Sequence, residues 1–401
     1  MKACKIDLVQ VGLWNPPESE KNKLFDHAKF SNSGLIYEDK ISSGVRTAFE
    51  NVYKLSVYPS VWWPKQKNLF LARGRNVSNS ECVIGYLNVI GIKDFSIANS
   101  IVREISKLVK ERKISRDARI NILFSVTNFY CALCLKRIKT ILPNSKIVLN
   151  ILDIPGLVES HKSKIERFLK KRLLHKFKNL TSKYADGFIL ISKYMSDLLQ
   201  IEKKPHLVIP GICYEFSNTL PSFPHQICYA GVIRDDYLCT KVLIDAFRKA
   251  KSLIPDLKLV ICGPGTNNYL FDNLQKGSIE YLGNLSPREV DMIQSSSGIL
   301  INLRENLPFF RYSFPSKITN YLSLGRPIIQ SNLDSIPEYI RDALVMVDDV
   351  NADSVAKAII KCITMTEEKR RILLKKESVV CKELSSESVA AEIQKLFDVI
   401  L

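Results

Sequence analysis

The sequence contains no long hydrophobic run. Its most apolar stretches, such as Ile147–Leu157, are short and are interrupted by polar residues and proline. A transmembrane helix needs about 20 predominantly apolar residues, so the sequence predicts no membrane-spanning helix. Charged residues also stand within Met1–Asp7, too early for the apolar core of a signal peptide. We therefore expect a soluble, cytoplasmic protein.

Glycine and proline are scarce, with 16 and 17 residues among 401, which excludes collagen-like and low-complexity architectures. Apolar residues make up 46% of the chain and charged residues 25%, a globular composition whose length predicts two or three domains. The 10 cysteines indicate reduced core residues rather than a disulfide framework. The close pair Cys131 and Cys134 has no second pair at zinc-binding spacing, so we interpret it as packing rather than a metal or redox site.

Acidic residues are too few to balance the basic ones, and the net charge is +17. This excess predicts a polyanionic partner: nucleic acid, an anionic membrane surface or phosphorylated substrates. It is concentrated between Glu159 and Lys183. Apolar residues of this segment share one helical face: Ile165, Phe168, Leu169, Leu173 and Phe177. Cations beside that face are candidate contacts for a membrane or acceptor surface: Lys170, Lys171, Arg172 and Lys176.

Two interpretations of this basic segment remain open. An amphipathic helix with cations on its flanks is typical of a membrane-surface helix. An ordinary surface helix would instead pack its apolar stripe against the protein and leave the lysines in water. Nucleic-acid binding is disfavoured, because the aromatic residues lie on the apolar stripe and the segment is rich in lysine rather than arginine.

Apolar strand-like runs alternate with helical periodicity along the whole chain, which predicts parallel sheets flanked by helices. The expected strands are 5–11, 120–126, 146–151, 187–191, 226–230, 258–262, 279–282, 298–302 and 327–330. The expected helices are 45–55, 98–112, 131–142, 194–202, 240–253, 287–295 and 316–324. A proline-containing stretch between Lys203 and Gln226 interrupts the alternation and indicates a connection between domains.

The second half of the chain contains two glycine-bearing strand ends. Ala230-Gly231 is followed by Arg234 and a predicted helix, an arrangement that can hold phosphate. Gly263-Pro-Gly265 imitates a dinucleotide fingerprint, but Asn268 replaces the third glycine and the motif follows a late strand. We interpret Gly263 and Gly265 as loop geometry at a strand end.

A longer pattern lies between Arg311 and Asn332. Pro315 stops the preceding loop, and Ser316 is expected to cap the N-terminus of a helix that ends at Gly325. Ser316 and Lys317 would then stand where free N–H groups favour an anion, with Asn320 one turn further along the same face. The alternative is an ordinary capped helix with a solvated lysine.

The spacing of Pro315, Ser316, Lys317, Asn320 and Gly325 resembles the signature helix of the family 4 glycosyltransferases. Other segments resemble that family in matching order: Ser42–Arg46, Phe188–Ser192, Val208–Gly211, Ala230–Phe247 and Tyr281–Glu289. Of these, Ser42–Arg46 resembles the family's first glycine loop, which is expected to approach the donor from the opposite domain. The resemblance implies the GT-B architecture, an α/β fold of two doubly wound, Rossmann-like domains facing each other across a cleft. We expect an acceptor-side domain over 1–206, a nucleotide-sugar domain over 207–384, and a C-terminal helix over 385–401 that returns to the first domain.

The resemblance implies a retaining enzyme that moves a sugar from a nucleotide-sugar, carrying UDP, GDP or another nucleoside diphosphate, to a saccharide acceptor. The basic segment between Glu159 and Lys183 predicts that this acceptor is lipid-linked. The resemblance assigns donor contacts to Gly44, Arg234, Asn284, Tyr312, Ser316, Lys317 and Asn320. The family usually carries glutamate where Asn320 and Tyr312 stand, and arginine where Val232 stands, so a catalytically inactive partner subunit is the alternative function.

No Asp-x-Asp pair is present at a strand end, so we expect cations and N–H groups, not a metal, to stabilise the leaving diphosphate. No cofactor is expected beyond the nucleotide-sugar co-substrate. Asp153, which ends an apolar strand of the first domain, is the candidate catalytic base, and a turn-capping role is the alternative. With an anionic membrane surface as partner, the enzyme would act at the cytoplasmic face of the membrane.

Overall fold

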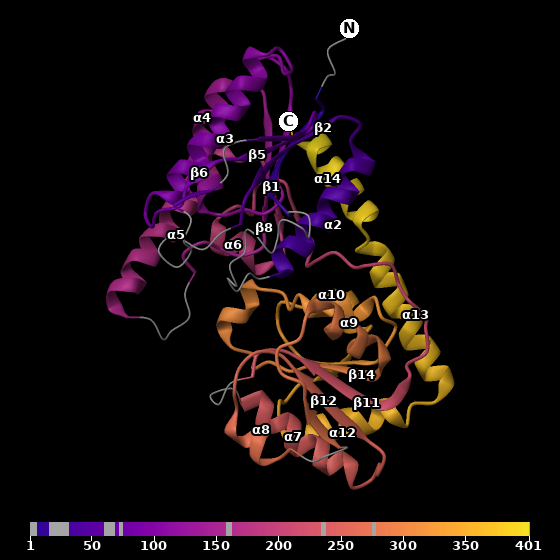
Figure 1. Cartoon of the computed structure of the whole chain (residues 1–401). Helices are drawn as coiled ribbons and strands as arrows, with labels where there is room; N and C mark the ends of the chain where they lie inside the picture. The colour runs from indigo at the N-terminus through magenta and orange to yellow at the C-terminus, as the bar shows by residue number, and fades with distance from the viewer. Residues whose placement is uncertain are drawn as a thin grey trace. The chain divides into compact units, whose positions relative to one another are not determined.

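A computed structural model describes residues 6–15, 32–59, 69–71, 75–157, 163–233, 238–274 and 278–400 (Figure 1). The chain forms two compact units. Unit 1 contains Met1–Ile212 and Ser386–Leu401, and unit 2 contains Cys213–Ser385. The first unit therefore ends six residues after the predicted boundary at 206.

Unit 1 is built on an eight-stranded sheet with the order β10-β9-β8-β7-β1-β2-β5-β4. The strands are β1 (Leu8–Leu13), β2 (Val52–Val57), β4 (Arg75–Ser78), β5 (Glu81–Ile84), β7 (Asn121–Phe124), β8 (Lys146–Ile151), β9 (Gly187–Leu190) and β10 (His206–Val208). All neighbours are parallel except β4, which runs antiparallel to β5. A separate antiparallel pair joins β3 (Phe70–Leu71) and β6 (Tyr86–Leu87). Strands β7, β8 and β9 are nearly continuous apolar runs, as expected where helices cover both faces of a parallel sheet.

The helices of unit 1 are α2 (Asn32–Ala48), α3 (Lys93–Lys110), α4 (Phe129–Ile141), α5 (Lys164–Tyr184), α6 (Tyr194–Leu199) and α14 (Ser386–Val399). Cys131 and Cys134 lie on α4 as buried thiols, and burial raises the pKa of both. The packing interpretation of this pair is therefore confirmed. None of the helices in the described part of the chain is both long and apolar enough to cross a bilayer.

The predicted helix over 45–55 is wrong. Helix α2 ends at Ala48, and residues Val52–Val57 form the parallel neighbour of β1. Lys54 made this segment look amphipathic, yet its ammonium is buried in the core, where it lies 3.0 Å from a carboxylate oxygen of Glu38. Gln10 and Ser125 also donate to Glu38, at 2.9 and 2.7 Å, so this buried charge pair is hydrogen-bonded on several sides.

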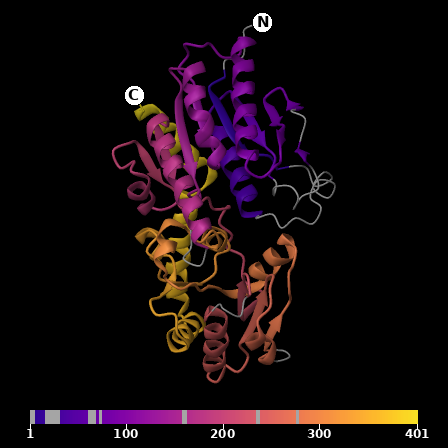
Figure 2. The ribbon, with the colours of Figure 1, turned by 90° about the vertical axis from the view of Figure 1, so that its left-hand side faces the viewer.

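The C-terminal helix α14 packs along α2, as Figures 1 and 2 show with the yellow helix beside the indigo one. Phe397 contacts Phe49 edge to face, with ring centroids 6.1 Å apart, and its carbonyl accepts a 2.7 Å hydrogen bond from Lys146 Nζ. Gly44 lies where the two helices cross. A Cβ atom there would come within 2.0 Å of the Ser386 carbonyl oxygen, so the close approach requires glycine.

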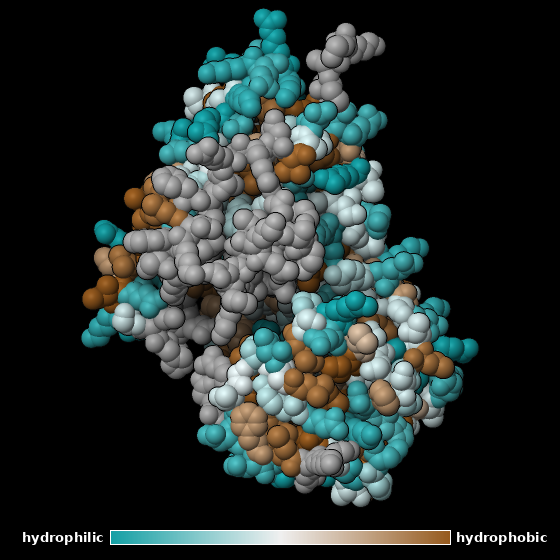
Figure 3. All heavy atoms as spheres, viewed as in Figure 1, coloured by the Kyte–Doolittle hydropathy of each residue, from teal (hydrophilic) through white to brown (hydrophobic). Residues whose placement is uncertain are grey.

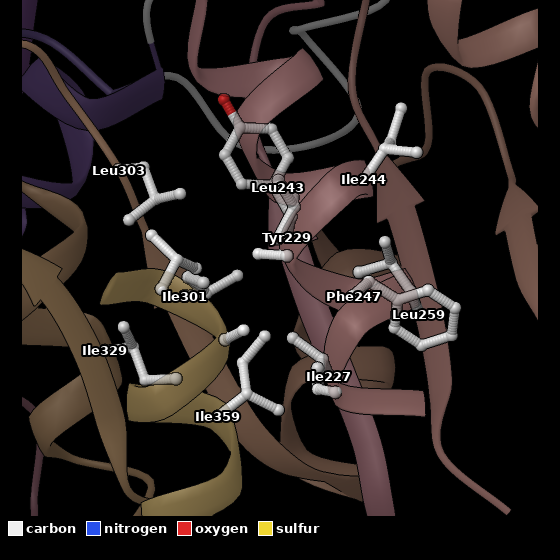
Figure 4. Packing of buried hydrophobic residues seen from close by; sticks show 14 of the residues in the cluster. Ile227, Tyr229, Leu243, Ile244, Phe247, Leu259, Ile301, Leu303, Ile329 and Ile359 are labelled. Carbon is white, nitrogen blue, oxygen red and sulfur yellow. The ribbon is translucent and has the colours of Figure 1, made fainter. Parts of the chain in front are cut away.

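Unit 2 is built on a six-stranded, fully parallel sheet with the order β13-β12-β11-β14-β15-β16. The strands are β11 (Phe223–Ala230), β12 (Lys258–Cys262), β13 (Ile279–Tyr281), β14 (Ser297–Asn302), β15 (Ile328–Ser331) and β16 (Val345–Val347). The order reverses direction at β11, which is the topological switch point at which doubly wound sheets bind ligands. Figure 4 shows core side chains from this sheet interlocking with those of its helices.

Local signals define the helices of unit 2: α7 (Leu238–Lys251), α8 (Asn268–Asp272), α9 (Pro287–Ser296), α10 (Lys317–Leu322), α11 (Glu338–Arg341), α12 (Ala352–Ile363) and α13 (Glu367–Glu383). Before α9, Ser286 and Glu289 form a reciprocal capping box, with Pro287 at the first helical position. A short 3-10 turn, η1 (Pro308–Tyr312), precedes α10.

Candidate functional site

The loops that follow β11 and β12 approach each other closely at the end of the sheet. Gly231 donates to the Cys262 carbonyl at 2.8 Å, and Ile233 pairs with Gly265. Gly263 has φ +140°, and a Cβ atom there would lie 1.8 Å from the Gly231 carbonyl oxygen. Gly263 and Gly265 therefore serve loop geometry, as the sequence predicted, and they hold Gly231 at the strand end.

Lys317, the first residue of α10, places its ammonium beside this loop. Its Nζ lies 5.4 Å from the centroid of the Tyr229 ring, and a Cβ atom on Gly231 would come within 2.7 Å of it. Loss of surrounding water, followed by repulsion from Arg304, lowers the pKa of Lys317 to about 8. The side chain is thus a poorly solvated cation aimed at the carboxyl end of β11.

Arg304 is a candidate site residue that the sequence did not reveal. It follows β14, and its backbone N–H donates to Ser331 Oγ at 2.8 Å while its guanidinium lies 5.7 Å from the Phe310 ring centroid. Within the described part of the chain, neither Arg304 nor Lys317 forms an ion pair with a carboxylate. Two cations close enough to repel each other, without an acidic partner there, favour binding of a multiply charged anion.

The predicted capping role of Ser316 is wrong. Ser316 is exposed and has helical backbone angles, φ −55° and ψ −20°, and its side chain makes no capping hydrogen bond. The first turn begins one residue earlier, since the Pro315 carbonyl already accepts from Ile318 N–H. With six residues, α10 offers a weak dipole, so Lys317 and Arg304 themselves supply the positive charge.

The sequence also predicted donor contacts at four other positions of unit 2, and two of them lie within five residues of Lys317 in the chain. Asn320 is half-buried on α10, three residues after Lys317, and Tyr312 is half-buried at the end of η1. Asn284 is exposed and follows Gly283, whose φ is +70° and whose carbonyl accepts a 2.8 Å bond from Gly263 N–H. Arg234 lies outside the described residues.

Gly44 does not form the glycine loop that was expected to approach a donor. It lies inside α2, the helix against which α14 packs. A glycine in mid-helix commonly serves close packing, and here the packing partner is the backbone at Ser386. The predicted loop conformation at 42–46 is therefore wrong.

Asp153 follows β8 at the carboxyl edge of the unit 1 sheet, the edge at which its parallel strands end. Its side chain is exposed on one side, while the protein around it removes water and raises the pKa of its carboxyl group. Gly156, with φ +87°, then brings this loop against α5, since a Cβ atom there would come within 2.5 Å of the Lys170 carbonyl oxygen. The candidate base and the basic helix therefore adjoin each other.

The four predicted surface cations all lie on α5. Lys170 pairs with Glu166 at 3.1 Å, and Lys171 is exposed. The guanidinium of Arg172 lies 5.0 Å from the Phe168 ring centroid, and Lys176 Nζ lies 5.6 Å from that of Phe95. The described residues contain no cluster of three or more His, Cys, Asp or Glu side chains suited to a metal ion.

The fold agrees with solved structures of glycosyltransferases along nearly the whole chain. Anabaena HepE in complex with UDP is 11% identical, with a TM-score of 0.63 and coverage of 98% of this chain and 100% of that chain. The catalytic domain of Arabidopsis thaliana starch synthase IV, bound to ADP and acarbose, is 11% identical, with a TM-score of 0.58 and coverage of 98% and 99%. The pneumococcal O-GlcNAc transferase GtfA, in complex with UDP and GlcNAc, is 10% identical, with a TM-score of 0.57 and coverage of 99% of both chains.

These likenesses confirm the predicted fold class: the chain has the two-domain α/β fold of the GT-B glycosyltransferases. The family described as "Glycosyl transferases group 1" matches residues 215–377, which form most of unit 2 and include Lys317 and Arg304. No curated protein matches the sequence.

Proposed function

We propose that this chain is a glycosyltransferase that moves a sugar from a nucleoside-diphosphate sugar to a saccharide acceptor. The observation that carries the proposal is the pair Lys317 and Arg304 at the switch point of a doubly wound sheet, inside the segment that matches the glycosyltransferase family. HepE, GtfA and starch synthase IV, which share the fold, hold UDP or ADP in their structures.

The chemistry explains why such a pair is useful. Transfer breaks the bond between the anomeric carbon and a diphosphate oxygen, and it forms a bond from that carbon to an acceptor hydroxyl oxygen. Negative charge develops on the leaving diphosphate, and fixed cations in a poorly solvated site stabilise it. Lys317 and Arg304 supply those charges in our proposal. We propose that Asp153 takes up the proton of the acceptor hydroxyl. Loss of surrounding water raises the pKa of its carboxyl group toward neutral pH, which makes it a stronger base than an ordinary carboxylate.

Retention of anomeric configuration and independence of a metal are finer parts of the proposal. Retention follows from the resemblance to family 4 enzymes. Metal independence follows from the two cations, which can neutralise the diphosphate without a bridging ion. We expect turnover of a nucleotide-sugar to persist in excess EDTA. Loss of turnover in EDTA together with its recovery in Mg²⁺ or Mn²⁺ would overturn this part while leaving the transfer function intact.

An inactive partner subunit is the competing function, motivated by Asn320 and Tyr312 at positions that carry glutamate in the family. A neutral amide can still donate to and accept from ribose hydroxyls, so we favour an active enzyme. A thermal-shift screen of UDP-, GDP- and ADP-sugars separates the two, because a protein that binds a donor is stabilised by it. Stabilisation by one donor, followed by release of its nucleoside diphosphate over time, is expected for the enzyme. A screen without any stabilisation would contradict the proposed function.

We further propose that the acceptor is lipid-linked and that the enzyme acts at the cytoplasmic face of the membrane. This placement depends on a surface of unit 1 that can bind lipid.

A further inference from the structure

We propose that the first half of α5, together with the segment that begins α3, binds the surface of an anionic lipid bilayer. The inference goes beyond sugar transfer and does not depend on it, because it rests on side chains of unit 1 alone.

The apolar stripe of α5 is divided into a packed half and an exposed half. Phe177 and Thr181 are buried against the rest of unit 1. Ile165, Phe168 and Leu169 are instead 74%, 57% and 58% exposed. Of the two interpretations of the basic segment, packing against the protein therefore applies at Phe177, and only the first half of the stripe is available to a membrane surface.

The exposed half also extends past the sheet. The loop after β8 meets α5 at Lys170 and Leu174, so the residues before Lys170 lie beyond the carboxyl edge. At 1.5 Å per residue the helix is about 30 Å long, enough for one part to pack and another to project. In Figure 1 this end of α5 stands away from the strands of unit 1.

A second set of exposed apolar side chains lies on the same flank. Ile90, Ile92 and Phe95, before and within the first turn of α3, are 64%, 49% and 49% exposed. Lys176 of α5 lies over the Phe95 ring, which joins the two elements into one surface. Figure 3 shows brown side chains on this flank, over the end of α5 and beside the start of α3, with teal ones between them. We call these six apolar residues and their neighbouring cations the docking face.

The charge of the docking face complements anionic headgroups. Helix α5 carries eight lysines and arginines and a single acid, Glu166, which is already paired with Lys170. Arg172 lies against the Phe168 ring, so insertion of that ring into the interface would bring the guanidinium to the headgroup level. Each basic side chain near an anionic membrane adds to the attraction, and the total falls with salt.

Charge and exposure together select the occupant. A second copy of the chain would place one strongly positive face against another, which repels. A nucleic acid would satisfy the cations but would leave Ile165 and Leu169 in water. An anionic bilayer satisfies both, because its interface accepts the apolar side chains and its headgroups accept the cations. We therefore commit to a lipid surface.

Co-sedimentation with vesicles of phosphatidylcholine and phosphatidylglycerol, compared with phosphatidylcholine alone, tests the proposal. Wild-type protein should bind the anionic vesicles, and raising the salt concentration should release it. Replacing Lys170, Lys171, Arg172 and Lys176 by glutamine should weaken binding at least about tenfold. Replacing Ile165, Phe168 and Leu169 by serine should weaken it similarly, but with less dependence on salt. The double variant Ile92→Ser and Phe95→Ser should weaken binding as well.

Helix α13 offers a matched control. It carries exposed cations of the same kind, Lys369, Arg371, Lys375 and Lys376, beside exposed Ile372 and Val379. Four Lys/Arg→Gln changes there alter the net charge equally but lie in unit 2, as do Ile372→Ser and Val379→Ser. These control variants should bind anionic vesicles like wild type.

Three outcomes would overturn the inference. If the wild-type protein does not bind anionic vesicles, the docking face does not exist. If the α5 and α13 charge variants lose vesicle binding equally, the binding reflects only the overall positive charge. Binding to single-stranded RNA that outcompetes anionic vesicles would assign the face to nucleic acid. Calorimetry on the same variants with UDP, GDP and ADP keeps the proposals separate. Lost vesicle binding with unchanged nucleotide affinity tests docking alone. Intact vesicle binding without affinity for any of the three nucleotides counts against the transfer function alone.

Discussion

The ammonium of Lys317 lies against Gly231, so close that a Cβ atom on that glycine would come within 2.7 Å of Nζ. That Cβ atom would also lie 2.9 Å from the Tyr229 hydroxyl. The strand end, the aromatic ring and the cation therefore form one tightly fitted unit. The far end of Lys317 and the hydroxyl end of the Tyr229 ring would both have to shift, and Tyr229 belongs to the buried core of unit 2.

Gly231→Ala should therefore weaken ligand binding strongly and lower stability slightly. We expect the displaced ammonium to weaken UDP affinity about tenfold, equal to about 1.4 kcal/mol, while the shift of the Tyr229 ring lowers the melting temperature only a little. Isothermal calorimetry and thermal melts measure the two quantities. Gly34→Ala is the matched control, because among the described residues its new Cβ atom would meet only Leu13 Cδ1, at an ordinary 3.7 Å. A large drop in melting temperature for Gly231→Ala would show that the glycine serves folding instead.

Lys317→Ala and Arg304→Ala should each weaken UDP binding, by about 1.5–3 kcal/mol for the loss of a charge-assisted contact. The double variant should lose less than the sum of the two, because each cation currently raises the energy of the other and both face one ligand. Lys258→Ala is the control, since Lys258 is exposed at the opposite end of β12. If the losses of binding free energy add fully, or if either single variant binds UDP like wild type, the two residues do not share one anion site.

Nucleotide binding should depend on pH through Lys317. Its pKa is lowered to about 8, so the free protein loses this charge as pH rises through that value. UDP affinity should therefore fall between pH 7 and pH 9, and Lys317→Arg should flatten the profile because arginine stays charged.

The lowered pKa of Lys317 also predicts how stability depends on pH. Below pH 8 the folded protein must bury a charged ammonium, which lowers the free energy of unfolding. This loss of stability is relieved as pH rises from 8 toward the ordinary lysine pKa, because the folded protein then releases the proton. Lys317→Met should accordingly raise the melting temperature at pH 7, and by less at pH 10.

Glu377 on α13 is completely buried, and no side chain of the described residues donates a hydrogen bond to either carboxyl oxygen. Burial raises its pKa well above the ordinary value, so the folded protein holds a proton that the unfolded chain releases. Stability should fall as pH rises above the ordinary glutamate pKa. Glu377→Gln should remove that dependence and raise the melting temperature at pH 7 by about 2–4 °C per kcal/mol gained. Melting curves from pH 5 to 8 that coincide for both proteins would contradict this account.

Much of the sheet could be predicted from the sequence, and the reason is burial on both faces. Strands β8 and β12 occupy 146–151 and 258–262, as predicted, because a parallel strand between two helical layers is a nearly continuous apolar run. Strand β2 escaped prediction because Lys54 and Ser56 interrupt its run. Their burial depends on Glu38 and Glu81, which come from other elements.

The residues of the candidate site also differ in whether the sequence alone could identify them. Lys317 could be identified from its motif, since the motif is contiguous in the chain. Arg304 could not, because nothing in the residues around it distinguishes it from an ordinary surface arginine. Only folding brings the end of β14 and the start of α10 close enough for its charge to lower the pKa of Lys317.

By itself the sequence determined the fold class, the basic character of α5 and the motif around Lys317, because each of these is encoded in local periodicity or spacing. The tertiary structure alone decided that Gly44 is a helix contact and that Ser316 lies inside a turn. It also decided that α5 buries Phe177 and exposes Phe168. The physical reason is common to all three. A residue's burial and backbone conformation depend on which distant segment packs against it, and that partner is not a property of the local sequence.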